Sequence, residues 1–356
     1  MSGWEQSSTK QNLSCAVRQP GGAVPTLWEC AVFYCPYSCG TFRFFKLMPM
    51  KITPSLVNEY MSDCTLCPRS CHADRLSGQT GFCGQTAELT AARAALHFWE
   101  EPCISGGTGS GTVFFSGCSL QCVFCQNHDI ALGKRGRIIS VERLTEIFLE
   151  LQAKGAANIN LVTPSHFIPQ ICLALEQAKQ GGLYIPIVYN SSGYENVVSL
   201  QLLEGLIDIY LPDFKYFSPE TAAKYSHAPD YFEKAAAAVA EMLRQVGAPV
   251  FDAGSGMLRK GVLVRHLLLP GQSADSKKVL RYLHDTYHND IYVSIMNQYT
   301  PLPHIAAFPE LNREITACEY DKILGFADKI GIEQGYMQEG GTAAESFIPS
   351  FDGEGL

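Results

Sequence analysis

The alternation of apolar strand-like runs with amphipathic stretches constrains the fold of this chain more than any other feature. Six runs rich in apolar and β-branched residues follow one another, and a helical pattern comes after each. The runs are Thr112–Ser116, Ile159–Thr163, Tyr184–Tyr189, Ile207–Leu211, Gly261–Leu269 and Ile291–Ile295. Near-continuous apolar strands are typical of buried parallel sheet. Six βα units therefore predict an α/β fold, and a barrel or partial barrel suits them better than a sandwich.

The same pattern predicts where the helices and the domain boundaries lie. We expect helices over Val141–Ala153, Ile168–Gln180, Asn196–Glu204, Pro219–Val246, Ser276–His288 and Ala317–Ile330. We expect four parts in chain order: an extension over residues 1–49 that is disordered or not native, a small cysteine-rich metal-binding segment over 50–104, the barrel over 105–335, and a tail over 336–356.

Cysteine usage and charge narrow the class of protein. The chain has 14 cysteines in 356 residues, and many stand in tight clusters. Disulfide scaffolds are small and secreted, whereas close-spaced cysteines in a large chain without an evident secretory signal indicate metal ligands. We therefore expect a cytoplasmic protein. The net charge of -8, with no run of Lys and Arg, argues against binding to nucleic acid or to an anionic membrane.

Three cysteines follow the first strand directly. Cys118, Cys122 and Cys125 form a C-x3-C-x2-C motif, on the loop at the end of the strand where parallel barrels build active sites. Three thiolates can each bind one iron of a cubane cluster and leave the fourth iron open for chemistry. Alternatively, His128 completes a closed Cys3His zinc site with a purely structural role.

This motif and the phrases around it resemble the radical S-adenosylmethionine (SAM) superfamily. Within it, the chain is similar to pyruvate formate-lyase activating enzyme-like proteins, in an uncharacterised subgroup with an extra N-terminal cysteine set. The resemblance spans about residues 55 to 335. The matching phrases are Glu100–Gly106, Phe114–Cys118, Val188–Tyr194, Asp208–Lys215 and Leu269–Gly271.

The resemblance implies a partial (β/α)6 TIM-like barrel with a [4Fe-4S] cluster on Cys118, Cys122 and Cys125. It also implies SAM as the second cofactor, cleaved by one electron to methionine and a 5′-deoxyadenosyl radical. We expect an oxidoreductase that activates or modifies a protein, as glycyl-radical activases do, and that receives electrons from an external low-potential donor. Two alternatives stay open: a radical SAM enzyme that acts on a small molecule, and a non-catalytic iron–sulfur or zinc module.

The resemblance assigns the cofactor contacts to residues at strand ends. Phe124 corresponds to an aromatic residue against the adenine, or is a hydrophobic plug over the cluster. Asn190, Ser191 and Ser192 correspond to polar contacts with the ribose, although a Ser-Ser-Gly sequence is also an ordinary turn.

Charged residues near the ends of three strands are the candidates for catalysis. Asp213 and Lys215 follow the fourth strand and Arg265 lies in the fifth, either as a buried ion pair or as contacts for SAM or substrate. The chain departs from its relatives at 163–166, where a Gly-Gly-Glu phrase commonly binds the SAM amino group. Another group must substitute there, and His166 is a candidate for a proton relay or a structural residue.

A second cysteine set precedes the barrel. Cys64, Cys67, Cys71 and Cys83 form a C-x2-C-x3-C-x11-C pattern, which is a complete four-ligand set. The pattern suits structural zinc and also suits a second [4Fe-4S] cluster, so both remain open. Cys103 is left over and is expected to be an inert buried thiol.

Overall fold

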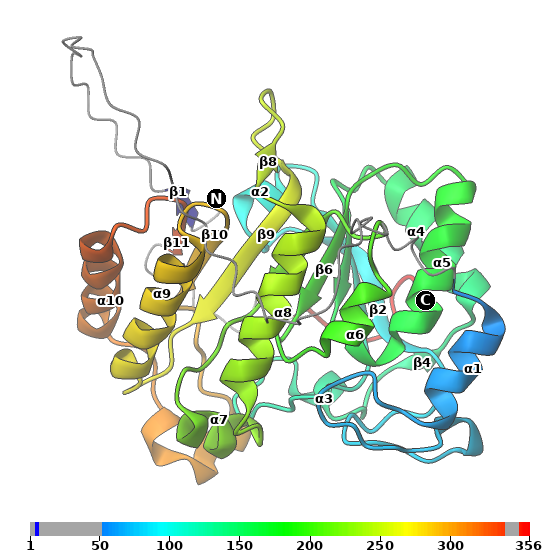
Figure 1. Cartoon of the computed structure of the whole chain (residues 1–356), viewed down its shortest axis with the longest axis horizontal. Helices are drawn as coiled ribbons and strands as arrows, with labels where there is room; N and C mark the ends of the chain where they lie inside the picture. The colour runs from blue at the N-terminus through cyan, green and yellow to red at the C-terminus, as the bar shows by residue number, and fades with distance from the viewer. Residues whose placement is uncertain (1–3, 7–51, 339–348) are drawn as a thin grey trace, which may run out of the picture.

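The computed structural model describes residues 4–6, 52–338 and 349–356 (Figure 1), so nearly all of the expected extension over 1–49 lies outside the described residues. Seven parallel strands form the centre of the sheet in the order β11-β10-β9-β7-β6-β5-β3. Their bounds are β3 Ser110–Phe115, β5 Ile159–Val162, β6 Ile187–Ser191, β7 Ile209–Pro212, β9 Leu258–Leu267, β10 Tyr292–Met296 and β11 Gly335–Gln338.

Shorter or antiparallel strands border this centre. β2 (Thr90–His97) pairs antiparallel with β3 and with β4 (Arg137–Ile138), while β1 (Trp4–Gln6) pairs antiparallel with β11. β8 (Val250–Phe251) pairs with β9 alone. The strands follow a path with two ends, so the barrel is open between β4 and β1. The predicted partial (β/α)6 barrel is confirmed.

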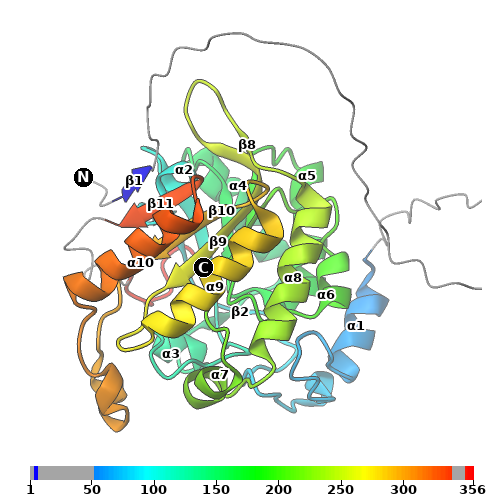
Figure 2. The ribbon, with the colours of Figure 1, turned by 60° about the vertical axis from the view of Figure 1, so that its left-hand side comes forward.

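Most of the longer helices lie along the outer side of the sheet (Figures 1 and 2). Their bounds are α4 Val141–Ala153, α5 Ile168–Gln180, α6 Val197–Gln201, α8 Tyr231–Val246, α9 Ser273–Tyr287 and α10 Ala317–Ile330. The remaining helical elements are α1 Pro54–Ser62, α2 Pro102–Ser105, α3 His128–Ala131, α7 Pro219–Ser226, η1 Arg75–Ser77, η2 Ser165–Phe167, η3 Pro303–Ala307 and η4 Pro309–Leu311. No helix of the described residues is long and apolar enough to cross a bilayer.

Local signals explain why some of these bounds could be predicted. α4, α5 and α10 have the predicted bounds. In α10, Thr316 and Glu319 form a reciprocal capping box at the start, and Gly331 adopts a left-handed conformation (φ +88°) just after the end. Such caps satisfy the backbone groups that a helix leaves free at its termini.

Two predicted elements were wrong in extent because of prolines. The helix expected over Pro219–Val246 is two helices, since Pro229 disfavours helical geometry at the preceding residue and His227 adopts a left-handed conformation (φ +54°). The strand expected from Tyr184 begins after Pro186, which has no N–H to donate to a sheet ladder.

The sheet also extends into the region expected to be a tail. Tyr336 of β11 is buried, and β11 continues the parallel sheet beyond β10. Farther on, the Gly353 N–H donates to Ala92 of β2, and Glu354 accepts from β2 as well. Four-residue strands and single edge contacts leave no periodic signal, so the sequence did not reveal them.

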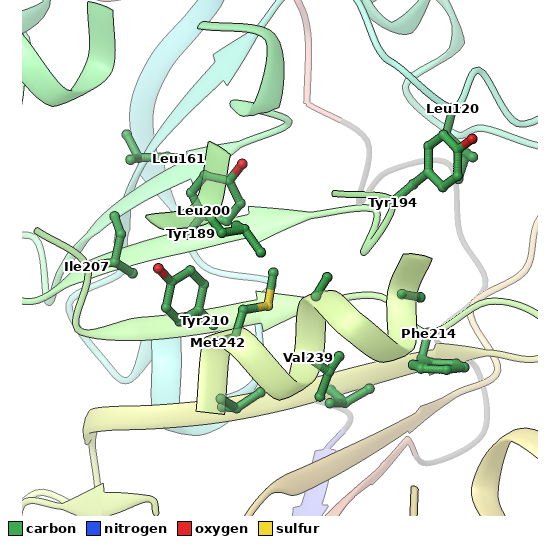
Figure 3. Close-up of a cluster of buried hydrophobic side chains, with 14 of the residues drawn as sticks. Leu120, Leu161, Tyr189, Tyr194, Leu200, Ile207, Tyr210, Phe214, Val239 and Met242 are labelled. Atoms are coloured by element: carbon green, nitrogen blue, oxygen red, sulfur yellow. The ribbon is translucent and has the colours of Figure 1, made fainter. Parts of the chain in front are cut away.

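The two faces of the sheet have different environments. Side chains such as Leu161, Tyr189 and Tyr210 pack against α8 and its neighbours in the main hydrophobic core, which Figure 3 shows. Because successive strand side chains alternate between faces, Phe114 and Val162 turn inward, where they form a separate cluster. The inner face is the one that meets the loops at the strand ends.

Candidate functional site

The three cysteines lie on the loop that leaves β3, as the motif predicted. Gly117 opens this loop with φ +86°, and a Cβ atom there would lie 2.6 Å from the carbonyl oxygen of Cys83. A side chain is therefore excluded both by conformation and by space. This close approach brings the loop against the N-terminal cysteine-rich segment.

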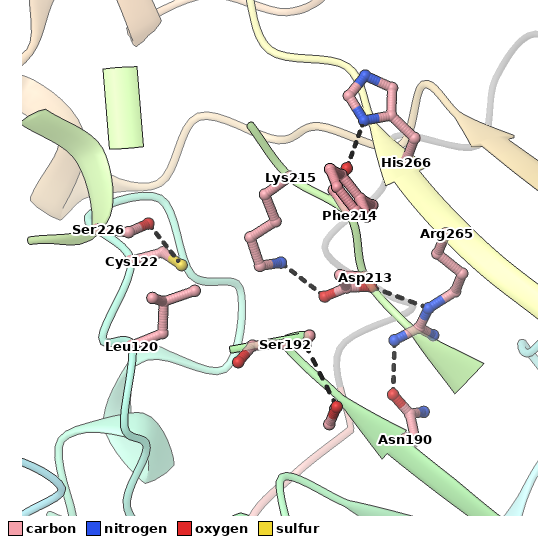
Figure 4. Close-up of polar contacts among 12 residues, drawn as sticks. Leu120, Cys122, Asn190, Ser192, Asp213, Phe214, Lys215, Ser226, Arg265 and His266 are labelled. Carbon is pink, nitrogen blue, oxygen red and sulfur yellow. Dashed lines mark hydrogen bonds and ion pairs between the residues drawn. The ribbon is translucent and has the colours of Figure 1, made fainter. Parts of the chain in front are cut away.

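Hydrogen bonds reach two of the three sulfurs. The Leu120 N–H approaches Cys118 Sγ at 3.4 Å, and the Ser226 hydroxyl donates to Cys122 Sγ at 3.0 Å (Figure 4). Burial raises the pKa of Cys122 to about 11, while the nearby Lys215 ammonium lowers it. Donors and a cation around the sulfurs favour the thiolate form that iron ligands require.

The donor set therefore fits a [4Fe-4S] cluster held by Cys118, Cys122 and Cys125. All three thiols influence one another electrostatically, and burial raises the pKa of each. Uncoordinated thiols with such raised pKa values would remain protonated, and an iron cluster bound by them would stabilise their thiolate form.

A buried polar network lies at the ends of the neighbouring strands. The Arg265 guanidinium bonds to Asp213 at 3.0 Å, Glu100 at 3.1 Å and Asn190 at 2.6 Å. The Lys215 ammonium bonds to the other Asp213 oxygen at 2.6 Å (Figure 4). These groups come from four separate segments, so the fold brings together residues that the sequence analysis could only consider one at a time.

The charges in this network hold one another in ionised form. Burial alone would raise the pKa of Asp213, but the adjacent Lys215 and Arg265 outweigh burial and lower it. Burial likewise disfavours charge on Lys215, yet Asp213 and Cys122 raise its pKa above the ordinary value. A fixed cation thus lies between a carboxylate and the triad, in position to interact with an anionic group bound there.

The residues expected at the ribose do not share one role. Asn190 bonds to Arg265 and to Glu100. Ser191 accepts the Gly193 N–H at 3.2 Å, which is the turn geometry considered as the alternative. Ser192 is half-buried and is the one of the three whose side chain has no described partner there.

Phe124 and His128 occupy positions that bear on two open alternatives. The Phe124 ring is buried beside Tyr299, with ring centroids 6.2 Å apart. The His128 ring stacks on His304 at 4.0 Å. Within the described residues, no three His, Cys, Asp or Glu side chains converge on a point where one metal ion would bind. The His128 ring is thus in contact with His304, a residue remote in the sequence.

His166 contacts the chain directly after β3, where the triad loop begins. Its Nε2 bonds to the Ser116 carbonyl at 2.6 Å, and its own carbonyl accepts from Arg75 at 2.6 Å. Burial lowers the pKa of His166 to about 3, helped by the Arg75 charge. The ring is neutral at physiological pH and fixes the end of β3. The preceding Thr163, in the phrase that replaces Gly-Gly-Glu, adopts a left-handed conformation (φ +57°).

The N-terminal cysteines lie near one another in a loop with little regular structure. Cys64, Cys67 and Cys83 are buried and Cys71 is exposed. The Phe82 N–H donates to Cys71 Sγ at 3.2 Å. Burial raises the pKa of Cys67, and the other three thiols raise it further. Four thiols therefore share one small region, with an amide donor directed at one of them.

Arg69 joins this segment to the triad loop. Its guanidinium donates to the Ser119 carbonyl at 2.8 Å and to the Ser226 carbonyl at 3.0 Å. Gln121 of the triad loop donates back to the Phe82 carbonyl at 2.7 Å. Because Ser226 also contacts Cys122, the two cysteine sets are parts of one packed unit.

Several of these residues were missed by sequence reasoning. Arg69, Arg75, Glu100 and Ser226 were assigned no role, although Glu100 stood in a matching phrase and Arg69 stood between two cysteines. Their partners lie far along the chain, so no local pattern could have identified them. Cys103, by contrast, is buried as expected, and burial raises its pKa to about 12.

Comparisons with known proteins bear on the central region and on most of the chain. Residues 112–283 match the model of the radical SAM superfamily. Uncharacterized protein MJ0674 of Methanocaldococcus jannaschii is 26% identical over 298 residues, which cover 81% of this chain and 80% of that protein.

Two solved structures are similar to part of this chain. They are Streptococcus suis SuiB bound to precursor peptide SuiA (TM-score 0.42) and SuiB bound to S-adenosylmethionine (TM-score 0.41), both at 10% identity. The alignments cover 62% and 60% of this chain. The chain spans less than half of SuiB, with 46% and 44% of that chain covered.

Proposed function

We propose that this chain is a radical SAM enzyme that modifies or activates a protein substrate by radical chemistry, and the match of residues 112–283 to the model of that superfamily supports the proposal. Cys118, Cys122 and Cys125 would hold the [4Fe-4S] cluster. When bound, the cluster supplies one electron that breaks the sulfonium C–S bond of SAM, which gives methionine and a 5′-deoxyadenosyl radical.

The chain's own residues position and shield this reaction. Lys215, held by Asp213 at 2.6 Å, presents a cation to the carboxylate of SAM. Arg265 bonds to the other carboxylate oxygen of Asp213 at 3.0 Å and so holds in place the carboxylate that positions the Lys215 ammonium. Phe124 and Leu120 are buried beside the triad and exclude water from it.

One observation supports a protein rather than a small molecule as substrate. The inner wall of the open barrel already accommodates a stretch of polypeptide, because Phe351 packs on Phe114 with ring centroids 5.4 Å apart. Phe114 precedes Cys118, the first cysteine of the triad, by four residues. A peptide chain can therefore approach the site through the open side of the barrel.

The first test is SAM cleavage. The protein is reconstituted with iron and sulfide without oxygen, reduced, mixed with SAM, and assayed for 5′-deoxyadenosine. Cys122→Ala should abolish the product. Cys318→Ala, which changes an exposed cysteine of α10, should leave it unchanged. No product from a wild-type protein with a full, reducible cluster would favour the non-catalytic iron–sulfur or zinc module instead.

The substrate class needs a second measurement. Candidate partner proteins and metabolites, each uniformly deuterated, are incubated with the enzyme, and deuterium in 5′-deoxyadenosine is measured. Transfer from a protein, or a protein radical seen by electron paramagnetic resonance, is the expected result. Transfer from a metabolite alone would replace the protein assignment with the small-molecule alternative.

We further infer that Cys64, Cys67, Cys71 and Cys83 hold a second [4Fe-4S] cluster, which passes electrons to the first. A zinc ion draws four thiolates to about 2.3 Å from one point, whereas a cubane gives each thiolate its own iron. Cys64, Cys71 and Cys83 all act electrostatically on Cys67, so the four thiols lie close enough to one another to share one cluster. The exposed Cys71 faces solvent, where an external low-potential donor can approach.

Metal analysis distinguishes these assignments without any activity assay. The wild type should contain about eight irons per chain and Cys71→Ser about four, because each cubane holds about four. Iron in the Cys71→Ser protein should still be reducible by dithionite but only slowly by a protein donor such as a flavodoxin. Loss of about one zinc and no iron from Cys71→Ser would show that the site is structural zinc.

A further inference from the structure

Residues 350–356 lie along the edge of β2, beside the opening of the barrel. β4 pairs with Thr90 and Ala91 only. Beyond it, the Gly353 N–H donates to the Ala92 carbonyl at 3.1 Å, and the Ala94 N–H donates to the Glu354 carbonyl at 2.8 Å. Figure 1 marks the end of the chain beside β2. Residues 350–356 thus cover this edge of β2 with two backbone hydrogen bonds and then turn, because the Leu356 N–H donates back to the Gly353 carbonyl.

Two positions of the 350–356 segment require glycine. Gly353 and Gly355 have φ values of +84° and +76°. A Cβ atom on Gly353 would lie 2.6 Å from Arg137 Nε, and one on Gly355 would collide with the Ala94 carbonyl oxygen. The backbone must approach β2 closely at both positions, so the path selects for residues without a side chain.

Arginines of the barrel receive the acidic groups of the segment. Arg93 donates to the Ser350 carbonyl at 2.9 Å and forms ion pairs with Asp352 and Glu354. The Arg93 side chain is 18% exposed, whereas Asp352 and Glu354 are 59% and 57% exposed. Arg137 adds a contact to the Asp352 carbonyl at 3.4 Å. Arg93 is therefore mostly buried in the barrel, whereas Arg137 and the two acidic side chains are exposed.

An aromatic ring anchors the segment on the inner wall. Phe351 meets Phe114 edge to face at 5.4 Å and packs on the cluster that contains Ala92, Ile130 and Val162. Phe114 and Val162 stand at the ends of β3 and β5, and Ile130 lies in α3, just after the triad loop. The ring therefore covers the wall next to the site where the radical would form.

We propose that this surface, here named the β2 groove and made of Arg93, Arg137, Phe114 and the edge of β2, is a docking site for an extended peptide of the protein substrate. The matching peptide is acidic and has an aromatic residue two positions before a glycine. The 350–356 segment occupies the groove until the substrate displaces it. This inference rests on the protein-substrate assignment and names how that substrate is recognised.

The contacts of the segment suit exchange with a partner. Ion pairs to exposed carboxylates contribute little to stability and are screened by salt. The other contacts are two backbone hydrogen bonds to β2, bonds from Arg93 and Arg143 to the carbonyls of Ser350 and Gly355, the Phe351 ring, and Leu356, which packs on the main core. A tethered segment competes at an effective concentration of about millimolar, so a partner must bind with extra contacts elsewhere or the segment must be weakened.

The test measures binding of a labelled peptide with the sequence of residues 349–356 to the reconstituted full chain by fluorescence anisotropy. Phe351→Ala weakens the internal segment but leaves the groove intact. It should tighten peptide binding about tenfold, which corresponds to about 1.4 kcal/mol. Adding Arg93→Gln to this variant should remove the binding. Arg259→Gln, on the distant β8–β9 hairpin, should have no effect.

Two results would overturn the proposal. One is the absence of peptide binding to a Phe351→Ala protein whose iron content and circular dichroism match the wild type. The other is equal binding of a peptide with the same composition in scrambled order. If Phe351→Ala does not fold, Gly355→Ala is used in its place, because the added Cβ would collide with the Ala94 carbonyl oxygen and weaken the internal segment while the groove stays intact.

The binding assay requires neither SAM nor reductant, so it separates this inference from the function it deepens. Peptide binding without SAM cleavage would contradict the proposed radical chemistry and leave the groove in place. SAM cleavage and deuterium transfer from a protein, without peptide binding, would overturn the groove alone.

Discussion

Replacing Arg265 by glutamine should destabilise the protein far more than a surface substitution does. Arg265 is the common partner of Asp213, Glu100 and Asn190, at 3.0, 3.1 and 2.6 Å. Its side chain is 15% exposed, and those of Glu100 and Asp213 are 10% and 17% exposed. Asp213 keeps Lys215 in the variant, but Glu100 loses its positive partner within the network.

The magnitude follows from the charge that is left behind. Removing one member of a buried ion pair costs about 3–5 kcal/mol, because the remaining charge stays desolvated without compensation. For a protein somewhat larger than 250 residues, 1 kcal/mol shifts the melting temperature by about 2–4 °C or slightly less. The apparent Tm of Arg265→Gln should therefore fall by roughly 6–15 °C.

A matched pair of variants makes this test sharp. Arg259→Gln removes an exposed arginine 3.9 Å from Asp252, and it should change the apparent Tm by no more than about 3 °C. The double variant Glu100→Gln, Arg265→Gln removes the orphaned charge together with its partner. It should recover at least half of the loss, since neutral amides can bond to Asn160 and Asn190.

Thermal unfolding is followed by circular dichroism without oxygen, at one scan rate and with iron content measured for each sample. The reasoning is refuted if Arg265→Gln melts within about 2 °C of the wild type, or if the double variant melts no higher than the single one. Either result would mean that water or a rearranged side chain compensates Glu100, so that the network does not act as a unit.

Three further outcomes follow from the same contacts. Gly117→Ala should reduce iron loading at both cysteine sets and destabilise the fold by more than about 3 kcal/mol. Gly155→Ala is the control, because Gly155 has a similar φ of +83° but open space around it, and it should cost only about 1–2 kcal/mol. Equal losses of unfolding free energy in denaturant titrations would contradict this prediction. Ser226→Ala removes the hydroxyl that donates to Cys122 Sγ at 3.0 Å, so the cluster should have a more negative reduction potential. The potential is measured by a redox titration followed by electron paramagnetic resonance, and an unchanged potential would exclude a role for this hydrogen bond. Burial raises the pKa of Glu195 to about 7, from 4.5 in the unfolded chain, so the folded state holds an extra proton between these values. The free energy of unfolding should therefore fall by on the order of 3 kcal/mol as pH rises from 4.5 to 7. Glu195→Gln should lose this pH dependence, and a variant with the same pH dependence as the wild type would disprove the assignment.

The sequence predicted the order of the barrel because that information is local. Apolar strands and amphipathic helices can be identified from the period of their side chains. The capping residues Thr316, Glu319 and Gly331 mark the two ends of α10. The C-x3-C-x2-C motif could be placed at the end of the first strand for the same reason. Pro229 also indicates a helix boundary in the sequence, but the amphipathic pattern on both sides of it led to the prediction of one continuous helix.

Other parts of the fold depend on pairing between distant segments. β2 pairs with β3 through a bulge between Ala91 and Arg93, and β11 is only four residues long. The bulge interrupts the side-chain period of β2, and β11 is too short to show a period. Their stability comes from the edge against which they pair, and that edge exists only once the barrel has formed.

What the sequence determined by itself is the fold class, the order of its βα units and the thiols that can hold the cluster, because each depends on residue type and spacing along the chain. Only the tertiary structure decided that Arg69 joins the two cysteine sets, that Arg265 gathers Glu100 and Asp213, and that Phe351 lies on the inner wall. The physical reason is the range of the interactions. Backbone propensity acts over a few residues, whereas hydrogen bonds, ion pairs and ring contacts require side chains from remote segments to arrive within a few ångströms of one another.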